Sequence, residues 1–426
     1  MSKLDAVYAK LPVWAQHMAV SGYGLYWRWL RFGPGFNAYL RSYQELEKVT
    51  VDQWKAWQDK QLRQVLSAAL AAPYYRQVWT SAQQKAAQEN DLFSLPLLEK
   101  EPIRAAPEAF LRMGIKPLRK LVFYTSGSTG TPLATYWTVP ELRQSLALRE
   151  ARSANWANVS FKMPRATFSG RMVEPDPNSR GPFYRYNAAE KQVYLSPFHL
   201  RADSAKRYVQ ALQKHQVQWL TGYAVSYYLL AKHILDQGLD IPPLRAVITT
   251  SEKVTIEMRI VMEKAYRCKV YEEYSTVENT VFASECEQGS LHISPDVAIV
   301  EILRPDGAPC APGEVGEVVA TNMSRLYQPL IRYRLGDLAA WDDQPCACGR
   351  HMPVLKEIVG RIEDVVIGLD GRQMVRFHGI FVNQPHIREG QIIQEQLDHI
   401  HVKVVPTVGF EDAHIEKIRH SNHKRL

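Results

Sequence analysis

The chain has 426 residues, of which 46% are hydrophobic and 23% charged, and its formal net charge is +8. This composition excludes a fibrous or disordered chain, and the length favours one large domain followed by a smaller one. No apolar run reaches the ~18 residues that a membrane span requires, and five cysteines do not make a disulfide scaffold in a chain of this length.

The charge and the first residues also narrow the function classes. The start, Met1 to Ala6, lacks a basic segment followed by an apolar stretch, which a secretory signal requires. We therefore expect a cytoplasmic protein. The basic balance favours anionic ligands, and a nucleotide fits this preference. No nucleic-acid-binding motif accompanies the charge, so we expect no nucleic acid partner.

The first 50 residues form an aromatic-rich segment that we expect to be helical. Trp14, Trp27 and Trp29 stand among tyrosines and phenylalanines, with Arg28 and Arg31 between them. One interpretation is an interfacial helix on anionic lipid, which would make the protein membrane-peripheral. The other is that the aromatic side chains pack on the main domain.

The elements that follow predict an α/β protein. Apolar spacing of three and four indicates a helix over 53–70, and strands and helices alternate from residue 121 onward. We expect helices over 205–212 and 258–265, strands over 217–220, 246–250 and 399–405, a hairpin of 298–302 with 315–320, and a polar helix-like segment at the end of the chain. Such alternation predicts sheets flanked by helices.

The segment Thr125 to Pro132 combines hydroxyl side chains and glycines directly after the apolar run Leu121–Phe123. Glycines let successive backbone N–H groups converge, and Ser126, Ser128 and Thr129 add hydroxyl donors, so the loop suits phosphate oxygens. It is not a Walker loop, because Gly130 is followed by Thr131-Pro132 and not by Lys. The alternative is an ordinary Ser/Gly surface turn.

Four further segments carry groups that suit a nucleotide. They are Tyr271–Glu278, Pro329–Asp337, Gly360–Asp364, and Gly222-Tyr223 with Phe198-His199 upstream. An aromatic face can stack on a base, and carboxylates can hold Mg²⁺ or ribose hydroxyls. Each signal alone is weak, since an isolated Asp or Arg is more often a solvated or salt-bridging residue.

The order and spacing of these segments resemble the adenylate-forming superfamily of acyl- and aryl-CoA ligases. Within it, the chain is most similar to the phenylacetate–CoA ligase-like branch, which includes the capsule-cluster homologues called CapK. The resemblance implies a large N-terminal AMP-binding domain over 1–360, with helix-flanked sheets and a distorted barrel. It also implies a small, mobile α+β domain over 361–426, with a hinge at Glu363.

The resemblance assigns roles residue by residue. The ATP phosphates would be cradled by Ser126, Gly127, Ser128, Thr129 and Gly130, and Glu278 would ligate Mg²⁺ with Thr276 beside the phosphates. Ser251 and Glu252 would lie along the adenine, Tyr274 would stack on it, and Asp337 and Arg361 would hold the ribose. The acid pocket would be lined by Phe198, His199 and Tyr223, with His199 as a catalytic candidate. The implied reaction is ATP-dependent adenylation of a carboxylic acid and transfer of the acyl group to CoA or an amine, in a polysaccharide or secondary-metabolite pathway.

Three departures from the family pattern motivate an alternative. Val277 stands where the family has a hydroxyl residue, and Glu363 stands where it has Asp. The family's Ser-Gly-Lys-type segment near the C-terminus has no counterpart, and Lys424 does not match it. We therefore expect either a truncated small domain or an impaired first half-reaction. The alternative function is a catalytically impaired nucleotide-binding or scaffold protein of capsule assembly.

A second site is expected from cysteine and histidine. Cys286 and His292 form one pair and Cys346 and Cys348 another, and three thiolates with one imidazole suit tetrahedral Zn²⁺. The alternative is that these are simply reduced cysteines, because Cys-x-Cys is a tighter spacing than the usual zinc pattern.

Overall fold

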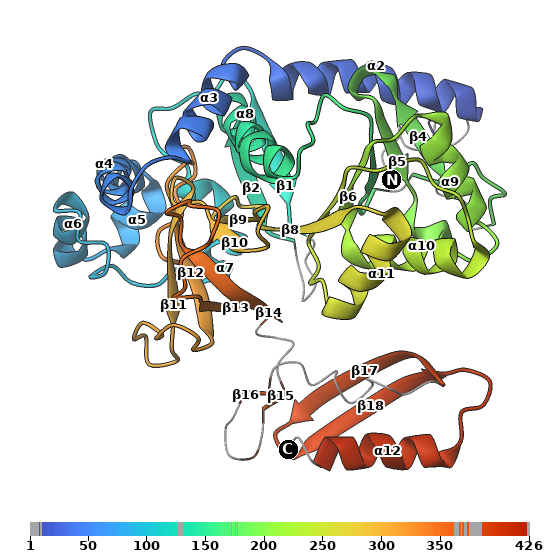
Figure 1. Ribbon diagram of the computed structural model, residues 1–426. Helices are drawn as coiled ribbons and strands as arrows, with labels where there is room; N and C mark the ends of the chain where they lie inside the picture. Colours follow the sequence, from blue (N-terminus) through green and yellow to red (C-terminus); the bar gives the residue numbers. More distant parts are fainter. Residues whose placement is uncertain are drawn as a thin grey trace.

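A computed structural model describes residues 8, 11–125, 132–171, 173–174, 176, 178–361, 366–367, 369, 373–374 and 386–423. Its centre is a mixed sheet with the strand order β11-β12-β13-β14-β10-β9-β8-β7-β6-β3-β5-β4 (Figure 1). The predicted α/β class is confirmed.

One half of this sheet is parallel. Its strands are β3 (Arg165–Phe168), β5 (Gln192–Leu195), β6 (Trp219–Tyr223), β7 (Ala246–Thr250) and β8 (Lys269–Ser275), with β4 (Tyr184–Asn187) antiparallel at the edge. The connecting elements are η3 (Ala188–Glu190), η4 (Pro197–His199), α9 (Ala205–Lys214), α10 (Ala224–Gln237) and α11 (Ile256–Tyr266). The predicted alternation is thus confirmed, and the strand expected from residue 217 begins at Trp219.

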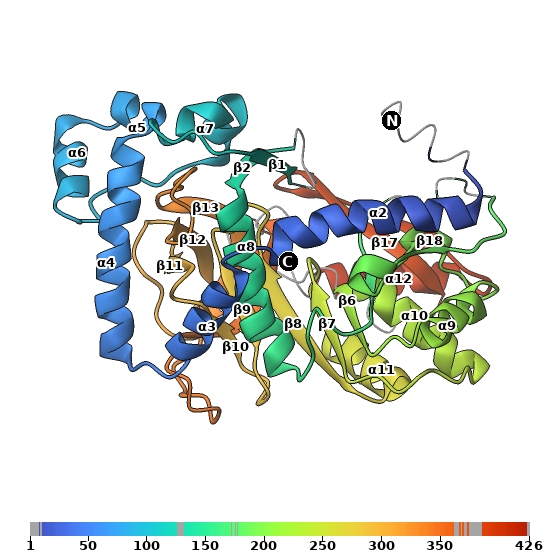
Figure 2. The same cartoon turned by 90° about the horizontal axis from the view of Figure 1, so that it is seen from above.

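Helices cover both faces of the parallel half. The apolar stripe of α9 is buried against Val193 and Leu195 of β5, in one core with α10 and α11. On the opposite face lies α2 (Val13–Phe32), where Ser21 Oγ donates to the carbonyl oxygen of Tyr186 in β4 (Figure 2). Side chains alternate across a strand, so the two faces meet different partners.

The other half of the sheet is antiparallel. Its strands are β9 (Phe282–Glu285), β10 (Leu291–Ile293), β11 (Ala298–Leu303), β12 (Gly316–Asn322), β13 (Tyr333–Trp341) and β14 (Val354–Arg361). The predicted hairpin is confirmed as β11 with β12, paired from Ala298↔Asn322 to Leu303↔Glu317. Among the described strands no pairing closes this half into the distorted barrel that we expected.

The remaining N-terminal elements pack around the sheet. They are α3 (Phe36–Leu46), α4 (Val51–Leu70), α5 (Pro73–Val78), α6 (Ser81–Gln88), α7 (Lys100–Ala105), η1 (Pro107–Phe110), the hairpin β1 (Lys120–Tyr124) with β2 (Ala134–Thr138), α8 (Val139–Leu148) and the π-helical turn η2 (Arg149–Ala154). The helix predicted from residue 53 begins at Val51, because Thr50 and Gln53 form a capping box. Within the described residues, no helix is long and apolar enough to cross a membrane.

Beyond β14 the structure describes β15 (Val366–Ile367), β16 (Gln373–Met374), β17 (Ile387–Gln396), β18 (His399–Pro406) and α12 (Asp412–His423) (Figure 1). Val366 and Ile418 are buried together against apolar residues of β17 and β18. The turn predicted at Asp370-Gly371 lies outside the described residues, and β15 and β16 on either side of it pair antiparallel.

Candidate functional site

Several predicted site residues lie where parallel strands end. β6 ends at Tyr223, β7 at Thr250 and β8 at Ser275, and these strands pair in parallel, so their carboxyl ends meet at one edge of the sheet. Such an edge is where open α/β sheets bind ligands. Ser251 follows β7 with φ 71°, an uncommon conformation for a residue with a side chain. Glu252 accepts a hydrogen bond from the backbone N–H of Val225 at 2.8 Å, which ties this loop to the start of α10.

Tyr274, Asp337 and Arg361 form a connected group. The Tyr274 hydroxyl donates to Asp337 Oδ2 at 2.7 Å, and Arg361 Nε lies 3.1 Å from Asp337 Oδ1. Four strand spacings separate β8 from β13 in the sheet order, about 19 Å if the sheet were flat. The sheet therefore curls strongly between them, and this curvature brings a β8 side chain into contact with β13.

The charges of this group are coupled through burial. Asp337 is 6% exposed, and burial raises the pKa of its carboxyl group, an effect opposed by Arg361 and by the hydrogen bond from Tyr274. Burial also raises the pKa of Tyr274 well above its usual value, and the neighbouring Asp337 adds to this. Tyr274 is therefore a neutral donor at physiological pH, and its bond to Asp337 fixes the position of the ring.

Glu278 is the second carboxylate of the site. It is buried, and its Oε1 accepts a hydrogen bond from the Tyr333 hydroxyl at 2.9 Å. Burial and the nearby Glu278 raise the pKa of Tyr333. A carboxylate held at one oxygen leaves the other for a cation, which suits Mg²⁺. Thr276 lies two residues earlier in the chain, and its hydroxyl is 3.0 Å from the hydroxyl of Thr280.

Two arginines that we did not predict support this turn. Arg325 is fully buried and donates to the backbone carbonyl oxygens of Glu278, at 2.7 Å, and of Tyr136 in β2. Burial lowers its pKa to about 10. Arg149, in η2, pairs with Glu273 and donates to Ser275 Oγ at 3.0 Å. No local pattern marks either arginine, because both act on residues more than 40 positions away.

The predicted phosphate loop lies outside the described residues, as does Glu363. The residues that flank the loop are described. Thr125 N–H donates to the carbonyl oxygen of Leu133, and Leu133 N–H donates to Thr125 Oγ1, each at 3.0 Å. These bonds extend the pairing of β1 and β2 by one residue at Thr125 and Leu133.

The three expected acid-pocket residues differ in burial and in partners. His199 is buried, and its two ring nitrogens lie 2.8 Å from Ser196 Oγ and 2.8 Å from the carbonyl oxygen of Asp176. Its ring stacks on Phe183. In this conformation neither nitrogen is available to a substrate. Phe198 is exposed, and Tyr223 lies at the end of β6. The roles of all three stay predictions.

The cysteine and histidine residues do come together. The ligand atoms of Cys286, His292, Cys346 and Cys348 all lie within 4.8 Å of one another. Cys286 and His292 are fully buried at the β9–β10 hairpin, and the two other cysteines lie on the loop before β14. His292 Nδ1 faces the carbonyl oxygen of Met352 at 3.3 Å, which leaves Nε2 toward Cys348 Sγ, also at 3.3 Å.

Comparison with known proteins finds one relative that matches most of this chain. The CapK protein of Staphylococcus aureus is 26% identical over 322 residues, which cover 73% of this chain and 68% of CapK. The phenylacetate–coenzyme A ligase of Thermus thermophilus is 38% identical over 89 residues, which cover 20% of each chain. These relatives place the sequence of this chain beside members of the adenylate-forming superfamily. The resemblance stated from the motifs is confirmed.

A solved structure shares the fold of this chain. 2-Hydroxyisobutyryl-CoA ligase, in an open conformation with 2-HIB-AMP and CoA, superposes with a TM-score of 0.64 over 89% of this chain and 91% of that chain, at 20% identity. No family model matches the chain.

Proposed function

We propose that this protein is an ATP-dependent ligase that activates a carboxylic acid as its acyl adenylate and transfers the acyl group to CoA. The observation that carries the proposal is the convergence of Tyr274, Asp337, Arg361 and Glu278 from three strands and a turn. These groups suit a base, a ribose and a magnesium–phosphate unit. The relatives that match are CapK and an acid–CoA ligase, which agrees with the proposal.

The chemistry asks the protein mainly for position and charge neutralisation. A carboxylate oxygen of the acid attacks the α-phosphorus of ATP, the bond to the bridging oxygen breaks, and pyrophosphate leaves. Mg²⁺ held at Glu278 would neutralise charge on the phosphates. The thiolate of CoA then attacks the acyl carbonyl carbon, and AMP leaves. Asp337 and Arg361 would hold the ribose through both steps, and the Tyr274 ring would pack on the base.

The domain organisation is part of the same proposal. We assign residues 1–360 to the nucleotide-binding domain and residues 361–426 to a smaller domain that moves about Glu363. The end of β14 at Arg361 and the separate apolar core around Ile418 support this division.

The decisive test is acid-dependent exchange of labelled pyrophosphate into ATP, measured with a broad panel of carboxylic acids. We expect exchange with at least one acid, and CoA-dependent release of AMP with the same acid. AMP binding without exchange for any acid would instead favour the alternative, a nucleotide-binding scaffold. AMP release that needs an amine in place of CoA would reassign the acceptor.

We also propose that Cys286, His292, Cys346 and Cys348 bind a structural Zn²⁺. Three sulfur atoms and one imidazole within 4.8 Å suit tetrahedral zinc. The Met352 carbonyl oxygen beside His292 Nδ1 would select the tautomer that offers Nε2 to the metal. Metal analysis of the purified protein should give one zinc per chain, and less than a tenth of that value would refute the assignment.

A peripheral membrane contact is a second proposal, and a specific surface favours it. Trp14, Met18, Leu25 and Trp29 follow one another at spacings of four, seven and four on α2, and each is at least 60% exposed. These spacings place them on one face of the helix. A groove of about 550 Å³ adjoins this face, and Arg28, Lys162 and Lys191 line it. Exposed aromatic residues beside cations suit an anionic lipid surface.

Vesicle flotation tests this contact. The full chain should float with vesicles that contain anionic phosphatidylglycerol at low salt, and less with vesicles of phosphatidylcholine alone. Replacement of Trp14 and Trp29 by serine should abolish flotation. Replacement of the exposed Ile256 on α11 by serine is the matched control, and equal flotation of the two variants would refute the proposal.

A further inference from the structure

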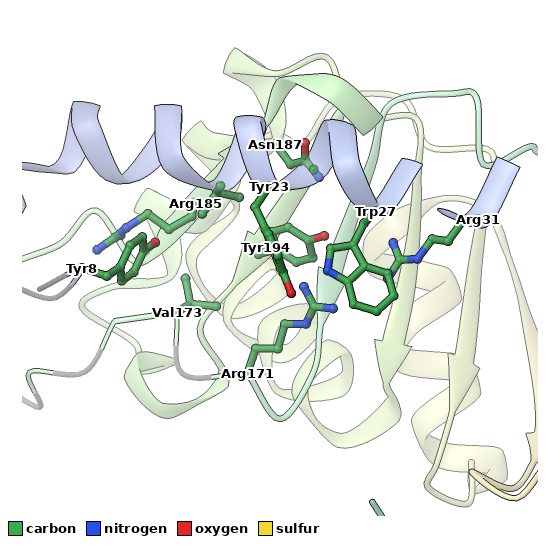
Figure 3. A pocket seen from close by; sticks show the side chains of 11 residues that line it. Tyr8, Tyr23, Trp27, Arg31, Arg171, Val173, Arg185, Asn187 and Tyr194 are labelled. Atoms are coloured by element: carbon green, nitrogen blue, oxygen red, sulfur yellow. The ribbon is translucent and has the colours of Figure 1, made fainter. Parts of the chain in front are cut away.

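The sheet face beneath α2 is polar, but the helix closes it. Figure 3 shows Tyr23 and Trp27 reaching from α2 into a pocket of about 110 Å³. Among the described residues Asn187 Oδ1 has no hydrogen-bond partner, and it packs against α2, because a Cβ at Gly24 would overlap the Asn187 amide. The residues that line this pocket are not those of the candidate active site. A charge that can act in that site lies on α7 instead.

The segment before α7 runs beside the start of β13. Leu98 N–H donates to the carbonyl oxygen of Arg332 at 2.9 Å, and Arg334 N–H donates to the carbonyl oxygen of Leu98 at 3.0 Å. These two bonds form a parallel bridge between Leu98 and Tyr333. Because Lys100 follows two residues later, at the start of α7, its position is fixed relative to β13 (Figure 1).

The direction of the Lys100 side chain follows from its neighbours. Glu99 has an extended backbone, and its carboxylate pairs with Arg334 at 2.8 Å. Side chains alternate along an extended backbone, so Lys100 leaves on the opposite side, which is the side of Tyr333. The Tyr333 hydroxyl donates to Glu278 at 2.9 Å. This side of β13 therefore faces the candidate active site.

The ammonium group of Lys100 acts electrostatically on this site. Burial raises the pKa of Asp337, and Lys100 is among the groups that oppose this effect and lower it. Burial likewise raises the pKa of Tyr333, and Arg104 acts to lower it. Lys100 and Arg104 are four residues apart on α7, so they share one face of the helix. That face is basic and lies near both carboxylates of the site.

Other cations around the site already have partners. Arg361 pairs with Asp337, and Arg149 pairs with a buried glutamate. Arg325 donates to two backbone carbonyl oxygens. Lys100 is half-buried, and within the described part of the chain its ammonium group has neither a hydrogen bond nor an ion pair. An ammonium group that is partly withdrawn from water and lacks a partner suits an anionic ligand.

We propose that Lys100 binds phosphate oxygens of the nucleotide and neutralises their charge while the acid attacks the α-phosphorus and pyrophosphate leaves. The phosphates would lie between the ribose at Asp337 and the Mg²⁺ at Glu278, which is the region that Lys100 faces. The large domain then provides a phosphate-binding cation from its own residues, without one from residues 361–426. This role rests on the proposed function, because it requires a nucleotide in the site.

Calorimetry of the full chain with MgATP and with adenosine tests this role. The two ligands share the base and the ribose, and they differ in the phosphates. Lys100→Met keeps a long side chain and removes its charge. It should weaken MgATP about 10- to 150-fold, which is the effect of one hydrogen bond to a charged group, and leave the affinity for adenosine unchanged. Lys100→Arg keeps the charge and should restore most of the affinity for MgATP.

Lys85→Met on α6 is the matched control. The Lys85 side chain is 72% exposed and pairs with Glu89, four residues later, away from the nucleotide group. This variant should bind both ligands as the unaltered protein does.

A phosphate-binding role of Lys100 is refuted if Lys100→Met binds MgATP as tightly as the unaltered protein. It is also refuted if Lys100→Met loses adenosine and MgATP to the same extent, since that result would indicate a structural role. Failure of the unaltered protein to bind either ligand would instead refute the nucleotide site itself and, with it, this role of Lys100. The two failures are therefore distinguishable.

Discussion

Asp337→Asn separates the nucleotide role of this carboxylate from a role in folding. Asp337 accepts from Tyr274 and faces Arg361, and only 6% of the residue is exposed. Asparagine keeps the shape and can still accept from Tyr274. It removes the charge that we expect to hold the ribose hydroxyls.

The size of the effect follows from these contacts. A hydrogen bond to a charged group contributes about 1.5–3 kcal/mol, so loss of one such bond should weaken AMP binding about 10- to 150-fold. The stability of the free protein should change much less. The Arg361 side chain is 44% exposed, and exposed ion pairs contribute about 0–1 kcal/mol.

The assay is calorimetric titration of AMP with thermal unfolding measured in parallel. Glu317→Gln is the matched control, because it removes a carboxylate that pairs with Arg334 in the same sheet, at a partly exposed position outside the nucleotide group. The control should bind AMP normally. Asp337→Asn with AMP affinity within threefold of the unaltered protein would refute the assignment of the ribose to this strand.

Three further predictions concern stability and metal content. Burial lowers the pKa of His215 to about 4, and its ring stacks on Tyr186. As the pH drops from about 6.5 to 4, the imidazole therefore binds a proton in the unfolded chain before it does so in the folded protein, and the free energy of unfolding should fall. Urea titrations should show a flatter pH dependence for His215→Phe, and equal slopes would contradict the cause. Gly222→Ala should destabilise the fold by about 1–3 kcal/mol, since a Cβ there would overlap the backbone of Phe168, and an unchanged urea midpoint would exclude this packing. A chelator should lower the unfolding temperature of the unaltered protein but not that of Cys348→Ser, and equal shifts in both would argue against the metal site.

Much of the architecture could be predicted from local patterns. Apolar spacing placed the helix of residues 53–70 and the strand of residues 246–250, because burial of one face is a property of a short segment. Cysteine and histidine spacing placed two ligand pairs, and the fold joins them.

The site was less predictable where contacts are long-range. Tyr274 and Asp337 are 63 positions apart, and only the curvature of the sheet between β8 and β13 makes them touch. The family resemblance placed His199 in the acid pocket, but tertiary packing engages both of its ring nitrogens. Arg325 carried no signal, because its partners come from β2 and from the turn at Glu278.

By itself the amino-acid sequence determined the class of the fold, the residues that suit a nucleotide and the resemblance to the adenylate-forming superfamily, since motifs and periodicity are local along the chain. Only the tertiary structure decided which of these residues meet, and that α2 covers a polar face with an unmet amide at Asn187. The physical reason is that contact depends on how the strands curl and how helices pack, and neither is encoded in the spacing of any single segment.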